Sequence, residues 1–149
     1  MSSKPTVDFY ILENMAKSVS LHFACQLIEK AYHKQQKIYV QTSSSKEAEY
    51  MDGLLWTFRD DSFLPHSLNS QERDQSPPIL IGFDLAPSHD PDVLVNLCQE
   101  IPAFYTQFNR IIEIVFSEPS VQQLARERYR LYRNRECQIN THKIKTLEM

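Results

Sequence analysis

Short runs of apolar and β-branched residues recur along the chain and predict the strands of a sheet. They lie at residues 7–12, 38–41, 79–83, 93–97 and 110–116. The first run is apolar almost throughout, which is typical of a strand covered on both faces. The run at 79–83 predicts a central strand, and the run at 93–97 predicts a strand at the edge of the sheet.

Between these runs, apolar residues recur at helical spacing. A first helix is predicted from Ser20, because the apolar residues that follow lie three, four and seven positions apart. A second is predicted from Ser44 to about Phe58. Ser44 and Glu47 have the spacing of a capping box, in which each side chain satisfies a backbone N–H of the first turn. Strands that alternate with helices in this way predict an α/β fold with a mainly parallel sheet and helices on both faces.

A third helix is predicted near the carboxyl end. Ser117 can cap it, and Pro119 is tolerated in its first turn. Its apolar residues face the sheet: Val121, Leu124, Ala125, Leu131 and Tyr132. The other face carries a strip of Gln122, Arg126, Tyr129, Arg130 and Arg133. Arg128 falls within the apolar stripe, so we expect its stem to pack there while its guanidinium reaches the rim.

The arginine strip suits a partner that carries carboxylates and an apolar side chain, because the planar guanidinium matches carboxylate geometry. Alternatively, the strip is a solvated face whose arginines pair with Glu127 and Glu136. The charge distribution is uneven: residues 120–149 hold seven Arg or Lys against three Glu, whereas residues 1–119 hold nine against sixteen Asp or Glu. An acidic body with a basic carboxyl end favours an anionic partner.

The stretch at residues 54–68 combines large apolar side chains with charge. It holds the single tryptophan, Trp56, and Phe63 on either side of the charged residues 59–61. Because the charges interrupt the run and Pro65 prevents a helix from continuing through it, we expect a contact surface here. Alternatively, Trp56 and Phe63 close the bottom of the core.

Length and composition favour a single globular domain: the chain has 149 residues, of which 42% are hydrophobic and 23% charged. The amino end lacks an apolar signal segment, and no apolar run approaches the ~20 residues of a membrane helix. We therefore expect a cytoplasmic protein with no membrane partner. Cys25, Cys98 and Cys137 form no C-x-x-C pair, which suits a reducing compartment with buried thiols and no disulfide.

The sequence offers neither a nucleotide loop nor a metal site. The serine-rich loop at residues 42–45 stands where an α/β fold would bind phosphate, but the chain has only two glycines, Gly53 and Gly82. A P-loop or a G-x-G-x-x-G turn cannot be built, so the fold is predicted to be Rossmann-like without a nucleotide cofactor. His22 and Cys25 lie one turn apart, but no second pair with ligand spacing accompanies them, and we predict no metal.

The most specific motif of the chain is Gln-Leu-Ala-Arg-Glu-Arg-Tyr-Arg-x-Tyr-Arg at residues 123–133. Leu-Trp at 55–56, Ser-Phe-x-Pro-His at 62–66, Asp-Phe-Tyr-Ile-Leu at 8–12 and Gln-Ile-Asn-Thr at 138–141 accompany it. Together these motifs resemble the chi subunit of the bacterial DNA polymerase III clamp-loader complex. The resemblance spans nearly the whole chain. It implies a non-catalytic adaptor with an α/β fold, which binds the psi subunit and the acidic carboxyl tail of single-stranded DNA-binding protein.

The resemblance implies that the stretch around Trp56 docks onto the clamp loader. Trp56 and Phe63 match aromatic residues that contact psi, or alternatively a repair helicase that competes for the same surface. We expect one rigid domain to bridge two partners, anchored by apolar burial at these aromatics and recruiting the tail with its last helix. Contact with nucleic acid would then be mostly indirect.

The resemblance also implies a tail-binding site on the last helix. Arg126 and Arg130 match basic residues that hold the carboxylates of the tail, with Tyr129 and Thr141 beside them. The chain departs from the family where Gln122 replaces a lysine. One basic contact is lost there, so we expect a lower or more salt-sensitive affinity for the tail.

Two other classes of function stay open from the residues alone. In a direct nucleic-acid-binding module, Arg126, Arg130 and Arg133 would contact phosphates themselves. In a small hydrolase or transferase, His66 and Asp61 would serve as acid and base, although no nucleophile has a recognisable setting.

Overall fold

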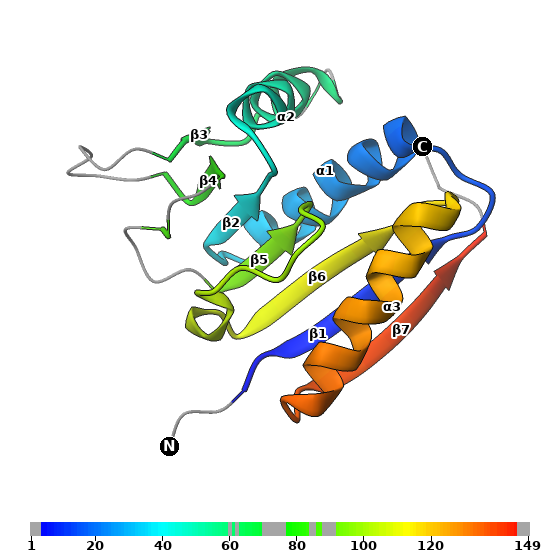
Figure 1. Cartoon of the computed structure of the whole chain (residues 1–149). Coiled ribbons are helices and arrows are strands. Elements are labelled where there is room, and N and C mark those ends of the chain that lie inside the picture. The colour runs from blue at the N-terminus through cyan, green and yellow to red at the C-terminus, as the bar shows by residue number, and fades with distance from the viewer. Residues whose placement is uncertain are drawn as a thin grey trace.

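Seven parallel strands form one sheet in the computed structural model, which describes residues 4–59, 61, 63–69, 77–83, 86–87 and 92–145 (Figure 1). The strands are β1 (Thr6–Leu12), β2 (Ile38–Gln41), β3 (His66–Leu68), β4 (Ile79–Gly82), β5 (Val93–Asn96), β6 (Arg110–Val115) and β7 (Gln138–Ile144). Their order across the sheet is β3-β4-β2-β5-β6-β1-β7, with every neighbouring pair parallel. The predicted strands at residues 7–12, 38–41, 79–83 and 110–116 are confirmed as β1, β2, β4 and β6.

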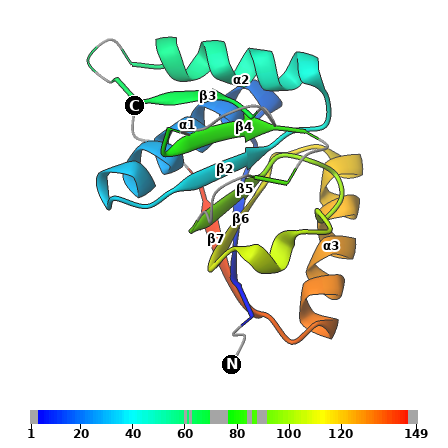
Figure 2. The same cartoon turned by 90° about the vertical axis from the view of Figure 1, so that its left-hand side faces the viewer.

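Helices cover both faces of this sheet. α1 (Lys17–His33) and α2 (Ser45–Thr57) pack on one face, and α3 (Pro119–Asn134) packs on the other with the 3₁₀ helix η1 (Tyr105–Gln107). Figure 2 shows the strands between α1 and α3. The predicted Rossmann-like α/β architecture is therefore confirmed. No helix in the described part of the chain combines the length and apolarity needed to cross a membrane.

The strands read as apolar runs because both of their faces are buried. In β2, Ile38 and Val40 belong to the core under α1 and α2, whereas Tyr39 belongs to the core under α3. All three side chains are fully buried. Successive residues of a strand face opposite sides, so a polar residue at any of these positions would enter one of the two cores.

The edges of the sheet differ from the prediction. β5 lies between β2 and β6, so the edge strand predicted at residues 93–97 is wrong. All four of its residues are buried, because the two cores cover its opposite faces. β4 has partners on both sides, as predicted for a central strand, with only β3 beyond it. The edges are β3 and β7, which the sequence analysis missed because β3 has three residues and β7 is mostly polar.

The helix starts confirm one of the two predicted caps. At α2, Ser44 Oγ accepts a hydrogen bond from the Glu47 backbone N–H at 3.2 Å. The Glu47 carboxylate accepts in return from the backbone N–H of Ser43 at 3.0 Å, one residue before the N-cap. At α3, the residue directly before Pro119 is the N-cap and its side chain makes no cap hydrogen bond, so the cap predicted at Ser117 is wrong. Pro119 does occupy the first turn.

A buried ionic network fixes α3 to the sheet. The Glu113 carboxylate in β6 is fully buried and accepts hydrogen bonds from Arg128 at 3.0 Å, Tyr132 at 2.6 Å and Asn96 at 2.9 Å. Burial raises the pKa of Glu113, while Arg128 opposes that shift. Arg128 also donates to the Gln99 backbone carbonyl at 2.9 Å and is only 6% exposed. The prediction that its guanidinium reaches the rim is therefore wrong, because Glu113 offers it a charged partner inside the fold.

The apolar face of α3 is confirmed for all but one residue. Ala125 and Tyr132 are buried, and Val121 and Leu124 are half-buried. Leu131 is 44% exposed, so its predicted place against the sheet is wrong. Neighbouring residues of a helix point about 100° apart, and with Tyr132 directed at the sheet Leu131 must point sideways.

A second polar cluster ties β7 to β1. The Asp8 carboxylate accepts hydrogen bonds from Arg110 at 2.6 Å and Asn140 at 3.1 Å, and it lies 3.1 Å from His142 Nε2. The His142 ring stacks on Tyr10 with centroids 4.6 Å apart. Burial raises the pKa of Asp8, but the hydrogen bonds from these neighbours outweigh burial and hold the net pKa below its usual 3.8.

We expect Asp8→Asn to destabilise the fold in a pH-dependent manner. A carboxyl with a lowered folded pKa stabilises the native state above its unfolded pKa, and this contribution is lost as the pH falls through the folded value. The variant should therefore lose about 2 kcal/mol of unfolding free energy at pH 7, and the loss should shrink as the pH falls below 3.8. Urea unfolding across this range measures it, with exposed Glu49→Gln as the charge-matched control. A deficit that is the same at every pH would contradict the expectation.

Candidate functional sites

The outer side of α3 presents the predicted arginines to solvent. We call this the basic strip, and it consists of Gln122, Arg126, Tyr129, Arg130 and Arg133, all exposed except the half-buried Gln122. No described acidic residue forms an ion pair with Arg126, Arg130 or Arg133. The structure therefore does not pair Glu127 or Glu136 with the basic strip. The guanidinium groups are available to an external anion.

Thr141 lies on the same side of the protein as the basic strip. Tyr129 of α3 packs on Phe9 of β1 with ring centroids 5.5 Å apart, and it remains 36% exposed. Thr141 of β7 is in register with Phe9, and residues in register on parallel strands face the same side of a sheet. The structure thus brings Tyr129 and Thr141 to one face, next to the helical row of Arg126 and Arg130.

Lys143 is a basic residue of this face that the sequence analysis did not assign. It is exposed and in register with Ile11, so it points to the same side as Thr141 two residues earlier. Ile139, two residues before Thr141, packs into the core under α3. Residues 139, 141 and 143 alternate along β7 and therefore face one side, which places Lys143 beside Thr141. This spacing is informative only once β7 is known to be a strand.

An exposed aromatic surface lies at the carboxyl end of α2. It consists of Trp56 and Phe63, whose ring centroids are 5.3 Å apart and whose exposures are 49% and 69%. The alternative in which both close the bottom of the core is wrong. Their sequence neighbours Leu55 and Leu64 are the residues that turn inward and are buried. Large aromatic side chains that touch one another at a surface are typical of protein-binding sites.

His66 lies beneath the aromatic surface. Its side chain is fully buried, and its ring centroid is 4.5 Å from that of Trp56. Nδ1 lies 2.5 Å from the Leu64 backbone oxygen, and Nε2 lies 3.0 Å from the Asp52 backbone oxygen. Asp61 instead accepts a hydrogen bond from a neighbouring arginine at 3.3 Å. The structure therefore does not bring His66 and Asp61 together as the acid and base of a small hydrolase or transferase.

The aromatic surface and the basic strip belong to opposite edges of the sheet. α2 contacts β3 at one edge, and α3 contacts β7 at the other (Figure 1). The six inter-strand spacings between these edges, at about 4.8 Å each, separate them by roughly 30 Å. The two surfaces are therefore well separated on the protein.

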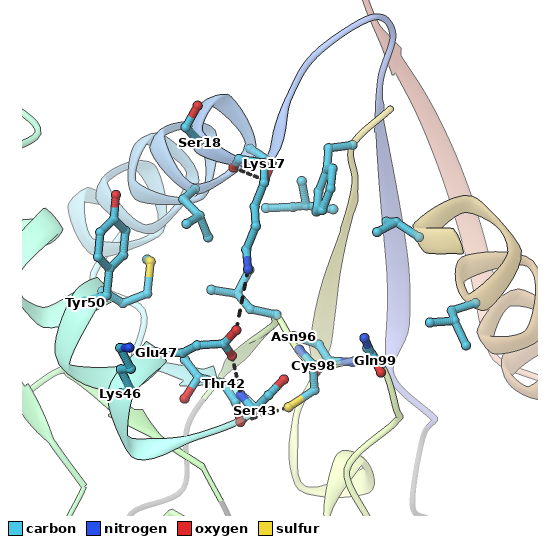
Figure 3. Close-up of a pocket in the computed structure, with 18 of the residues that line it drawn as sticks. Lys17, Ser18, Thr42, Ser43, Lys46, Glu47, Tyr50, Asn96, Cys98 and Gln99 are labelled. Atoms are coloured by element: carbon cyan, nitrogen blue, oxygen red, sulfur yellow. Dashed lines mark hydrogen bonds and ion pairs between the residues drawn. The ribbon is translucent and has the colours of Figure 1, made fainter. Parts of the chain in front are cut away.

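A cavity of about 720 Å³ opens at the carboxyl ends of β2, β5 and β6 (Figure 3). The connections after β2 and β5 leave toward opposite faces of the sheet, and α/β folds often bind ligands at such a point. Here the Glu47 carboxylate occupies the start of α2, where it accepts from the Ser43 backbone and pairs with Lys17 at 3.6 Å. A phosphate at that helix start would meet this negative charge, which adds to the sequence argument against a nucleotide loop.

His22 and Cys25 do not point to a metal site. His22 packs edge-on against Phe58 with ring centroids 5.9 Å apart. Cys25 is fully buried, and burial raises the pKa of its thiol to about 12, which disfavours the thiolate that a metal requires. Within the described ranges, no three His, Cys, Asp or Glu residues gather as a ligand cluster.

Comparison with known proteins finds relatives along nearly the whole chain. Residues 5–140 match the family model described as DNA polymerase III chi subunit, HolC. The DNA polymerase III subunit chi of Pseudomonas aeruginosa is 36% identical over 138 residues, which cover 93% of this chain and 96% of that protein. The protein of the same name in Haemophilus influenzae is 31% identical over 141 residues, covering 93% and 97%. That of Escherichia coli is 28% identical over 138 residues, covering 89% and 94%.

Proposed function

Since the chain belongs to the family of DNA polymerase III chi subunits, accessory subunits in DNA replication, we propose that it is a non-catalytic adaptor with two binding surfaces. The aromatic surface docks the psi subunit of the clamp-loader complex. The basic strip holds the acidic carboxyl tail of single-stranded DNA-binding protein. The observation that supports this function is the presence of two exposed surfaces of different chemistry at opposite edges of one rigid sheet.

The chemistry of the basic strip suits a short acidic peptide that ends in phenylalanine. Arg126 and Arg130 are exposed and make no ion pair with a described residue, so each can donate charge-assisted hydrogen bonds to a carboxylate. Tyr129 over Phe9 offers an aromatic floor for the terminal side chain of the peptide. Lys143 adds a positive charge on the same face, where Gln122 provides none.

The chemistry of the aromatic surface suits a partner that buries large rings. Trp56 and Phe63 are in contact with each other, and two charged residues between them in the sequence, Arg59 and Asp61, are paired with one another at 3.3 Å. Such an arrangement exposes an apolar anchor with a polar rim, as in many protein interfaces. A repair helicase that buries similar side chains would compete with psi for the same surface.

Weak tail binding is sufficient for this adaptor. A single-stranded DNA-binding protein with several tails presents each of them at a high effective concentration once the first has bound. The clamp-loader assembly would then stay near coated single-stranded DNA while individual contacts exchange quickly. No chemical step is required of the chain.

Arg126→Ala should weaken the binding of a peptide with an acidic stretch and a terminal phenylalanine by about tenfold, because a charge-assisted hydrogen bond is lost. Calorimetry at two salt concentrations measures the affinity. Lys30→Ala, which removes an equal charge from an exposed position on α1, is the matched control and should bind the peptide like the wild type. Equal affinity of the Arg126 variant and the wild type for the peptide would show that the tail does not bind the basic strip.

Direct binding of nucleic acid is the second candidate, and the exposed arginines of the basic strip, which pair with no described acidic residue, favour it. In this case the basic strip would contact phosphates, and affinity for bare single-stranded DNA would fall steeply with salt. Titration of the purified chain with an oligothymidylate at 50 and 200 mM salt distinguishes the two functions. The adaptor requires that recruitment to coated DNA disappear when the tail of the single-stranded DNA-binding protein is deleted.

A further inference from the structure

We propose that His66 is the positioning residue of the aromatic surface: one buried imidazole holds the end of α2 and the segment before β3 in the arrangement that the partner binds. This inference deepens the proposed function and rests on it, because it concerns the same surface. It adds a residue that would never touch the partner, since the His66 side chain is fully buried.

The arrangement of the two exposed rings needs such a support. Trp56 belongs to α2, whereas Phe63 lies outside any helix or strand, in the segment that leads to β3. Their exposures are 49% and 69%, so the surrounding side chains cover each ring only in part. The contact between them, with centroids 5.3 Å apart, joins two elements across a turn of the chain. Leu55 and Leu64 anchor the two elements in the core, and a group that contacts both elements would further fix the exposed rings relative to each other.

His66 contacts both elements and is itself anchored in the sheet. Nε2 faces the backbone oxygen of Asp52 in α2 at 3.0 Å, and in an α-helix that carbonyl also accepts the N–H of Trp56. Nδ1 faces the backbone oxygen of Leu64, the residue after Phe63, at 2.5 Å. The backbone of His66 pairs with Ile79 of β4, so the sheet fixes the backbone position from which the imidazole extends.

The imidazole also supports the indole directly. The ring centroids of His66 and Trp56 are 4.5 Å apart, so the tryptophan contacts the buried imidazole as well as Phe63. A surface held in its bound arrangement before the partner arrives avoids the loss of side-chain and loop freedom on binding. The consequence is that removing His66 contacts should weaken docking without removing any side chain from the interface.

The test compares His66→Phe with His66→Gln. His66→Phe keeps a ring of similar size but loses the polar contacts to the Leu64 and Asp52 backbone oxygens and to the Asp52 carboxylate, 3.4 Å from Nε2. The amide of His66→Gln can still donate to Asp52. Purified psi subunit is the probe, and calorimetry measures its affinity. His66→Phe should bind psi about tenfold more weakly, because the two rings and residues 63–65 must be ordered on binding. His66→Gln should lie between this variant and the wild type. His33→Gln, an exposed histidine at the end of α1, is the matched control.

A spectroscopic readout separates positioning from general stability. Trp56 is the single tryptophan of the chain, so its emission and its quenching by acrylamide report on this surface alone. Both should change in the His66 variants, while binding of the acidic peptide should stay at the wild-type level. Loss of folding in both variants would assign His66 to the core and overturn the proposal, as would wild-type psi affinity in a folded His66→Phe. If Trp56→Ala also binds psi normally, the docking surface itself is misassigned, which is a failure of the proposed function.

Discussion

Arg128→Ala should lower the free energy of unfolding by about 3–5 kcal/mol, because it leaves the buried Glu113 carboxylate without its charged partner. Glu113 is fully buried and Arg128 is 6% exposed, so the ion pair lies in a region of low dielectric constant where an unpaired charge is costly. Tyr132 and Asn96 would still donate to the carboxylate, but neither carries a charge. The loss is a large fraction of the stability of an ordinary domain. Chemical denaturation followed by far-ultraviolet circular dichroism measures it.

The pH dependence identifies the cause of this loss. Without Arg128, only the hydrogen bonds from Tyr132 and Asn96 oppose burial, so the folded pKa of Glu113 rises further above the usual 4.5. A group with a raised folded pKa stabilises the fold below its unfolded pKa, and that contribution is lost as the pH rises through the folded value. The Arg128→Ala deficit should therefore be smaller at pH 5 than at pH 8.

Two further variants serve as controls for the buried pair. Arg130→Ala removes an exposed arginine two residues away and should change stability by less than about 0.5 kcal/mol. The double variant Arg128→Met with Glu113→Gln removes both charges, keeps an acceptor for Tyr132, and should recover most of the loss. A double variant no more stable than Arg128→Ala would contradict the unpaired Glu113 charge as the cause, because the methionine also restores packing in place of the arginine stem.

The parts of the fold with a strong local pattern were predictable from the sequence. β1, β2, β4 and β6 are mostly apolar and largely buried on both faces, so their residues stand out as runs whatever surrounds them. The capping of α2 by Ser44 depends on residues three positions apart and was equally visible. The arginine-rich motif at 123–133 identified the family because its residues are consecutive.

The parts that depend on long-range contacts were not predictable in the same way. Arg128 lies in a stretch of arginines, and only the carboxylate of Glu113 on a distant strand draws it inside. β7 is polar because one face meets the Asp8 cluster and the other borders the basic strip, so it shows no apolar run. The position of Lys143 follows from the register of β7 with β1. That of His66 follows from its contacts with α2 and with the segment before β3. Neither can be seen in the local sequence.

Trp56→Ala should weaken the binding of psi by at least about thirtyfold, the effect expected of an aromatic anchor at the centre of an interface. Trp56 is 49% exposed and in contact with Phe63, so the free protein presents it without rearrangement. A partner that covers both rings would bury the larger of them almost completely. Calorimetry with purified psi measures the affinity, and Phe63→Ala should give a smaller loss in the same direction because the phenylalanine ring has less area.

Tyr50 offers a matched control within the same helix. It is also aromatic and is 56% exposed, more than Trp56, but it lines the cavity at the carboxyl ends of the strands and not the aromatic surface. Tyr50→Ala should therefore leave the affinity for psi unchanged. Equal losses for Tyr50→Ala and Trp56→Ala would show that the partner covers α2 as a whole, and no loss for either would place psi elsewhere on the protein.

Binding of the acidic peptide completes the argument for two separate surfaces. The aromatic surface and the basic strip border opposite edges of the sheet, roughly 30 Å apart. Mutations at sites that far apart without shared partners are expected to act independently. Trp56→Ala should thus bind the peptide with wild-type affinity. The double variant with Arg126→Ala should lose as much affinity for psi as Trp56→Ala does, and as much affinity for the peptide as Arg126→Ala does. If Trp56→Ala instead abolishes both interactions while the chain stays folded, the two partners share one surface, and the chain cannot bridge them.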